Sequence, residues 1–72
     1  MNPMDQIMER EIAHLEQIVR MLTVADRVDI KYWERRVEAL KARASVPMHL
    51  TRLEHIAVQI NRLRIGASPD AG

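Results

Sequence analysis

The sequence predicts an all-α protein, a three-helix antiparallel bundle in up-down-up order. Apolar residues recur every three or four positions along three stretches, which is the period of an amphipathic helix. No stretch alternates apolar and polar residues as a half-buried strand does. Glycine occurs only at Gly66 and Gly72. We expect one domain over residues 1–66, followed by a disordered tail over residues 67–72.

The first helix is expected over about residues 3–22. Asn2 is a good N-cap, Pro3 suits the first helical position, and Asp5 lies near the positive helix end. Apolar residues cover about half of this helix, whereas packing on one neighbour needs an arc of little more than 100°. We therefore expect self-association, most simply as a two-fold homodimer of coiled-coil type. The residues predicted for this interface are Met4, Met8, Ile12, Leu15, Val19 and Leu22.

The second helix is expected over about residues 27–44. The apolar phase of the first helix breaks near Asp26 and restarts at Ile30, with no Gly or Pro between the two stretches. One kinked continuous helix is therefore the alternative to two separate helices. Trp33 shares the phase of Ile30, which predicts that it is mostly buried. Tyr32 lies off that phase and is predicted to be an interface residue, since aromatic side chains are enriched at binding hot spots.

The third helix is expected over about residues 47–65. The run Ser45-Val46-Pro47 should end the second helix, because the residue before a proline is pushed out of the helical region. Gly66 is a natural C-terminal stop. Short connections on both sides of the second helix favour antiparallel neighbours.

Glu11 is the most conspicuous polar residue, because it falls within the apolar arc of the first helix. A carboxylate there must be paired or reach water. We interpret it as a residue that fixes register or partner choice, and we expect it to face His49, Arg52 or a base of a second copy. His49 should be buried and satisfied by a carbonyl or carboxylate. Glu16 has the spacing of a solvated i,i+4 pair with Arg20.

The sequence gives little support for catalysis or metal binding. There is no cysteine, and the serines are confined to a turn and the tail, at Ser45 and Ser68. Glu11 and His14 have the Glu-x-x-His spacing of di-iron bundles, but the other helices contain no second motif. We predict no catalytic residue, no metal or cofactor site and no small-molecule substrate.

Charge is divided unevenly along the chain. Residues 1–30 hold six acids and three bases, whereas residues 31–66 hold three acids and eight bases. This polarity favours side-by-side packing of the two halves, and it could also present a basic face to an acidic partner. The bases are interleaved with acids and point several ways, so nucleic-acid binding is a less favoured possibility.

The function predicted from the sequence is that of a small non-enzymatic helical module for protein–protein interaction or oligomerisation. Adaptors, assembly factors and regulators fall in this class. The alternative is a small nucleic-acid-associated regulator that uses the basic residues of the second and third helices. Neither a signal peptide nor a membrane-spanning run is evident, so we expect a cytoplasmic protein without a membrane partner.

Overall fold

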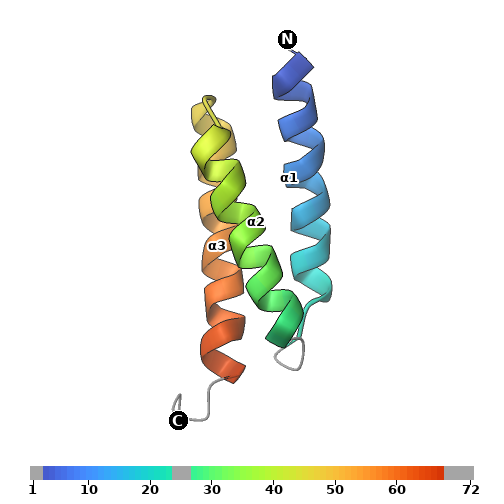
Figure 1. Cartoon of the computed structure of the whole chain (residues 1–72), viewed down its shortest axis with the longest axis vertical. Helices are drawn as coiled ribbons and strands as arrows, with labels where there is room; N and C mark the ends of the chain where they lie inside the picture. The colour runs from blue at the N-terminus through green and yellow to red at the C-terminus, as the bar shows by residue number, and fades with distance from the viewer. Residues whose placement is uncertain (1–2, 24–26, 68–72) are drawn as a thin grey trace.

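Three helices make up the structure, a computed structural model that describes residues 3–23 and 27–67. They are α1 (Pro3–Met21), α2 (Arg27–Arg43) and α3 (Pro47–Ala67). α1 and α3 run in one direction and α2 runs in the opposite direction, as Figure 1 shows. The predicted all-α, up-down-up bundle is therefore confirmed. α1 and α2 are separate antiparallel helices, which removes the alternative of one continuous helix.

The helix ends agree with the expected ones to within two residues. The carbonyl of Val46 accepts the backbone N–H groups of His49 and Leu50, at 3.0 and 3.2 Å, and so closes the first turn of α3. Ala67 belongs to α3, although the tail was expected to begin there. The rest of that tail, the expected N-cap Asn2 and the break near Asp26 lie outside the described residues.

All three helices contribute to one apolar core. Its most completely buried side chains come from every helix and include Ile12, Ile30 and Leu53. Trp33 packs against this core and is mostly buried, as its phase predicts, although it lies at the edge of the core beside His14 and Tyr32. The full buried apolar set is Met8, Ile12, Leu15, Val19, Ile30, Val37, Leu40, Leu53, Ile56 and Ile60.

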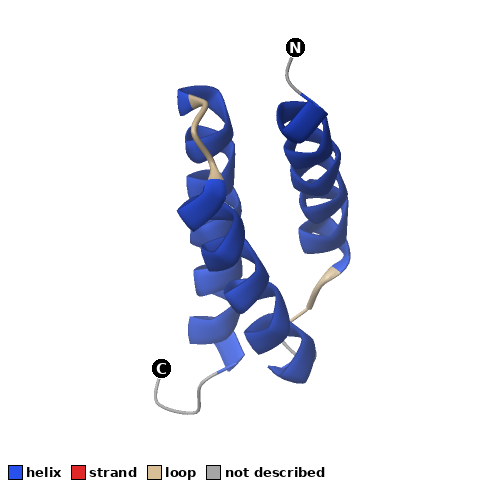
Figure 2. Cartoon of the chain, turned by 45° about the horizontal axis from the view of Figure 1, so that its top comes forward, coloured by secondary structure: helices blue, strands red, loops and turns tan. Residues whose placement is uncertain are grey.

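α3 is the helix against which the other two pack. Ion pairs lie along the contact between α3 and α2: Lys41 lies 3.1 Å from Glu54, and Arg64 lies 3.0 Å from Glu34. α1 also packs along α3 but makes few close backbone contacts with α2. Figure 2 shows α1 and α2 diverging away from their connection, so that α1 stands apart at its N-terminal end. The two flanks of α1 therefore have different surroundings.

Candidate functional site

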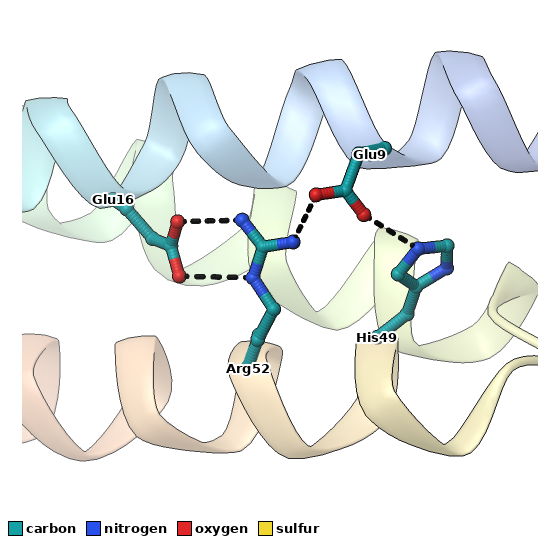
Figure 3. A network of polar contacts seen from close by, with 4 residues as sticks. All are labelled: Glu9, Glu16, His49 and Arg52. Atoms are coloured by element: carbon teal, nitrogen blue, oxygen red, sulfur yellow. Dashed lines mark hydrogen bonds and ion pairs between the residues drawn. The ribbon is translucent and has the colours of Figure 1, made fainter.

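The flank of α1 toward α3 is closed by a network of four side chains, which we call the polar clamp: Glu9, Glu16, His49 and Arg52 (Figure 3). Glu9 and Glu16 are seven residues apart, so they project from the same side of α1. His49 and Arg52 are three apart on α3 and meet them from below in the view of Figure 3. The clamp thus joins the acidic first helix to the basic third helix.

Arg52 lies at the centre of the polar clamp. Its Nε donates to one carboxylate oxygen of Glu16 at 3.1 Å, and its Nη2 donates to the other at 2.7 Å. This two-pronged geometry is the strong form of an arginine–carboxylate contact. Nη1 donates to Glu9 on the preceding part of the helix. One guanidinium therefore holds two carboxylates in place.

His49 completes the clamp from a buried position, with 5% of its surface exposed. Its Nε2 donates to Oε2 of Glu9 at 2.9 Å, since an ionised carboxylate can only accept. Nδ1 is buried without a hydrogen-bond partner within residues 3–23 and 27–67. The prediction that His49 is buried and satisfied by a carboxylate is confirmed.

The contacts of the clamp favour its charged form. Hydrogen bonds from Arg52 and then His49 lower the pKa of Glu9, against the opposing effect of desolvation. The hydrogen bonds from Arg52 likewise lower the pKa of Glu16. Glu16 and Glu9 in turn raise the pKa of Arg52. The two carboxylates and the guanidinium of the clamp therefore stay ionised throughout the physiological pH range.

Glu11 does not belong to this network, so the expectation that it faces His49 or Arg52 is wrong. Its Oε1 lies 3.2 Å from Nη2 of Arg36 on α2. The reason is helical geometry, because two residues turn a helix by about 200° and place Glu9 and Glu11 on opposite flanks. Glu16 is likewise bound to Arg52 across the seam, and not solvated beside Arg20 as the sequence suggested.

The opposite flank of α1 carries a second series of residues with alternating steps of three and four. Glu11 and His14 occupy its middle and contact α2 through Arg36 and Trp33. Met4, Ile7 and Met21 keep 55%, 50% and 79% of their surface exposed. The complete series is Met4, Ile7, Glu11, His14, Ile18 and Met21. This spacing is that of a coiled-coil seam.

A matching series runs along α2 beside it. Tyr32 is 55% exposed, and its ring meets Trp33 edge-on at a centroid distance of 4.8 Å. Arg36, Ala39 and Arg43 follow at steps of four, three and four, and all are exposed. We call these two series together the α1–α2 face. It is apolar over much of α1 and mixed aromatic and basic along α2.

A small hollow deepens the α1–α2 face where α1 stands away from α2. It holds about 90 Å³ and is lined by Met4, Ile7 and Glu11 of α1, by Arg43 and Ala44 at the end of α2, and by neighbouring residues. Sites for drug-sized ligands are usually about 300 Å³ or more. The hollow therefore suits a single side chain of a partner better than a small-molecule substrate.

The eight residues predicted for an interface differ in how far the structure buries them. Met4 and Tyr32 are exposed on the α1–α2 face, and Glu11 and Leu22 are half-buried. The other four, Met8, Ile12, Leu15 and Val19, are buried in the core of the single chain, so their burial needs no second copy.

Sequence reasoning missed Ile7, His14, Ile18 and Met21 as members of one exposed face. The signal was present, because these residues repeat the three-and-four spacing in a phase different from that of the core series. This second series was not distinguished from the core series, because both were interpreted together as one wide apolar arc. The second flank becomes visible only when the arc is divided into two seams.

Two further findings bear on the kind of site. Within the described ranges, no three His, Asp or Glu side chains lie close enough together to hold a metal ion, so Glu11 and His14 have no further ligands there. None of the described helices combines the length and apolar composition needed to cross a membrane.

No protein-family model, curated protein or solved structure matches this chain.

Proposed function

We propose that this chain is a non-enzymatic helical interaction module that binds a helical protein surface through the α1–α2 face. One observation carries the proposal: α1 bears a complete second seam of three-and-four spacing that its own bundle leaves largely uncovered. A helix with one neighbour needs only one such seam. Exposed apolar surface that follows a regular seam is typical of an interaction site.

The composition of the face supports protein contact. Ile7, Met4 and Met21 provide apolar area, and Tyr32 adds an exposed ring of the type enriched at binding hot spots. Met side chains adapt to irregular partner surfaces because they are unbranched and flexible. Arg36 and Arg43 lie at the edge, where charges set specificity more than affinity.

A matched pair of variants tests this proposal. Ile7→Glu places a charge at an apolar position of the exposed seam, whereas Val58→Glu makes a comparable change on α3, where Val58 is also about half exposed. We expect Ile7→Glu to lose binding to proteins captured from lysate, or to a second copy, while Val58→Glu retains it. Both variants should keep the helical circular dichroism of the parent.

Salt and nuclease separate this function from the nucleic-acid alternative. An apolar contact should change little between low and moderate salt, whereas phosphate binding loses about three orders of magnitude or more for six or more phosphate contacts. Binding that survives nuclease and moderate salt and is lost in Ile7→Glu supports the proposal. Binding that disappears with nuclease, or that is equal in both variants, contradicts it.

A further inference from the structure

We propose that the α1–α2 face binds a second copy of this chain, with the two α1 helices antiparallel about a two-fold axis near the middle of α1. This inference rests on the proposed function and names the partner for the same face. It comes from the order of residues along the second seam of α1. Read from either end, the series begins with methionine, continues with isoleucine and reaches a polar residue.

The seam is symmetric about a point between Ile12 and Ala13. Its six members form three pairs at equal distances from that point; the two outer pairs are identical residues, and the inner pair is a complementary acid and imidazole. The pairs are Met4 with Met21, Ile7 with Ile18, and Glu11 with His14. A two-fold axis through the point brings each residue level with its counterpart on the second copy. Methionine then meets methionine, isoleucine meets isoleucine, and carboxylate meets imidazole.

The polar pair selects the antiparallel direction. In a parallel arrangement the two Glu11 carboxylates would lie opposite one another at the centre of an apolar seam, and like charges there are destabilising. In the antiparallel arrangement each Glu11 lies opposite a His14 that can donate a hydrogen bond to it. Antiparallel helices also place opposite ends of their dipoles side by side.

The neighbouring helix fits the same axis. The contacts of Glu11 with Arg36 and of His14 with Trp33 place the middle of α1 level with the stretch of α2 between Trp33 and Arg36. Rotation about the axis then brings Tyr32 level with position 37 of the second copy, about 3 Å along the helix from Ala39. The large exposed ring thus comes near the smallest side chain of the α2 series. Each Arg36 near the axis keeps its own Glu11 carboxylate at 3.2 Å.

Engineered cysteines test the register directly, because the natural chain contains none. Two variants are made, Ile7→Cys and Ile18→Cys, and are mixed under mild oxidation. In the proposed register Ile7 of one copy lies opposite Ile18 of the other. Two copies of Ile7, in contrast, lie about 16 Å apart along the helix axis, at 1.5 Å per residue. A disulfide requires Cα atoms within about 7 Å.

We expect the mixture to give a disulfide-linked heterodimer that neither variant gives alone. Ile7→Cys mixed with Val58→Cys, an exposed position on α3, is the matched control and should give none. The unmodified chain should show twice its monomer mass of 8.4 kDa by light scattering at micromolar concentration. If either α1 variant folds poorly, Met4→Cys with Met21→Cys tests the outer pair at more exposed positions.

Three outcomes overturn the inference and separate it from the proposed function. Cross-linking of Ile7→Cys with itself indicates a parallel pair and refutes the register. A chain that stays at 8.4 kDa but still captures another protein through Ile7 refutes the second copy and leaves the proposed function standing. A chain that remains a monomer and whose Ile7→Glu variant behaves like Val58→Glu refutes both.

Discussion

The two flanks of α1 differ in how completely the other helices cover them. The flank toward α3 is closed by the polar clamp, in which Glu9 and Glu16 share one arginine. The flank toward α2 carries more apolar residues, yet Met4, Ile7 and Met21 remain exposed. Apolar character alone therefore does not identify the side of a helix that its own bundle covers.

The glutamates show how local this difference is. Glu9 and Glu11 are two residues apart on the same helix, but Glu9 binds Arg52 and the buried His49, whereas Glu11 forms an ion pair with the exposed Arg36. The contacts of Glu9 lower its pKa. The closed flank thus holds α1 against α3, whereas the open flank keeps a partly exposed ion pair near its middle.

The largest effect should come from the core beneath both flanks. Leu53 is fully buried on α3, the helix against which α1 and α2 both pack. We expect Leu53→Ala to lower the free energy of unfolding by about 2–5 kcal/mol, which threatens a chain of this size. Val58→Ala, on the exposed side of α3, should change it by about 0.5 kcal/mol or less. Thermal melts of the two variants measure the difference, and equal melting temperatures would contradict the assignment of α3 as the shared support.

The fold could be predicted because its signals are local and redundant. The core phases of the three helices, the proline at the start of α3 and the short connections all indicate the same antiparallel order. The predicted burial of Trp33 is borne out, but phase gives a direction from the helix axis and not the distance to the next helix. It therefore does not distinguish Trp33, at the edge of the core, from the more deeply buried Ile30.

Removing the centre of the clamp should have the next largest effect. Arg52→Met keeps an unbranched apolar stem but leaves Glu9 and Glu16 without their shared cation. Charge-assisted hydrogen bonds contribute about 1.5–3 kcal/mol each at most, and partial exposure to solvent reduces this contribution. We therefore expect Arg52→Met to lower the free energy of unfolding by about 1–3 kcal/mol. Arg62→Met, at an exposed position on the same helix, is the control and should have little effect.

This pair of arginine variants also separates the two flanks. If the clamp closes only the α1–α3 seam, Arg52→Met should lower the melting temperature of the chain and leave binding through the α1–α2 face intact at temperatures where the chain is folded. Urea melts and solution mass, measured side by side, show both properties. A stability equal to that of Arg62→Met would mean that the clamp adds nothing measurable to the fold.

Acid should weaken the closed flank. The folded-state pKa values of Glu9 and Glu16 are lowered from 4.5 by their hydrogen bonds to Arg52. A lowered folded pKa contributes stability that is fully present above the unfolded value and is lost as pH falls through the folded value. We therefore expect the free energy of unfolding to fall as pH drops below 4.5 and to fall less steeply in Arg52→Met. Urea melts at several pH values measure both slopes, and parallel slopes would contradict this origin.

The candidate site was less predictable than the fold, and Glu11 shows why. The sequence places a carboxylate in the apolar arc and bases at the start of α3, but it does not say which flank of α1 faces which helix. That assignment depends on the handedness of the bundle, which local periodicity does not contain. Glu16 was expected to be solvated for the same reason, although its spacing of seven from Glu9 places the two on one flank.

The smallest effect on stability, and the most specific effect on assembly, should come from Glu11→Leu. The Glu11–Arg36 pair is partly exposed, and such pairs contribute about 0–1 kcal/mol, so the melting temperature should stay the same or rise slightly. The second seam, however, loses its central carboxylate and with it the repulsion that disfavours the parallel arrangement. When Glu11→Leu is added to Ile7→Cys, we expect this cysteine to cross-link with itself as well as with Ile18→Cys.

His14→Leu alone serves as a comparison, because it keeps the two Glu11 carboxylates and should preserve the antiparallel preference. If Glu11→Leu unfolds the chain, or leaves the cross-linking pattern unchanged, Glu11 does not set the register of the open flank.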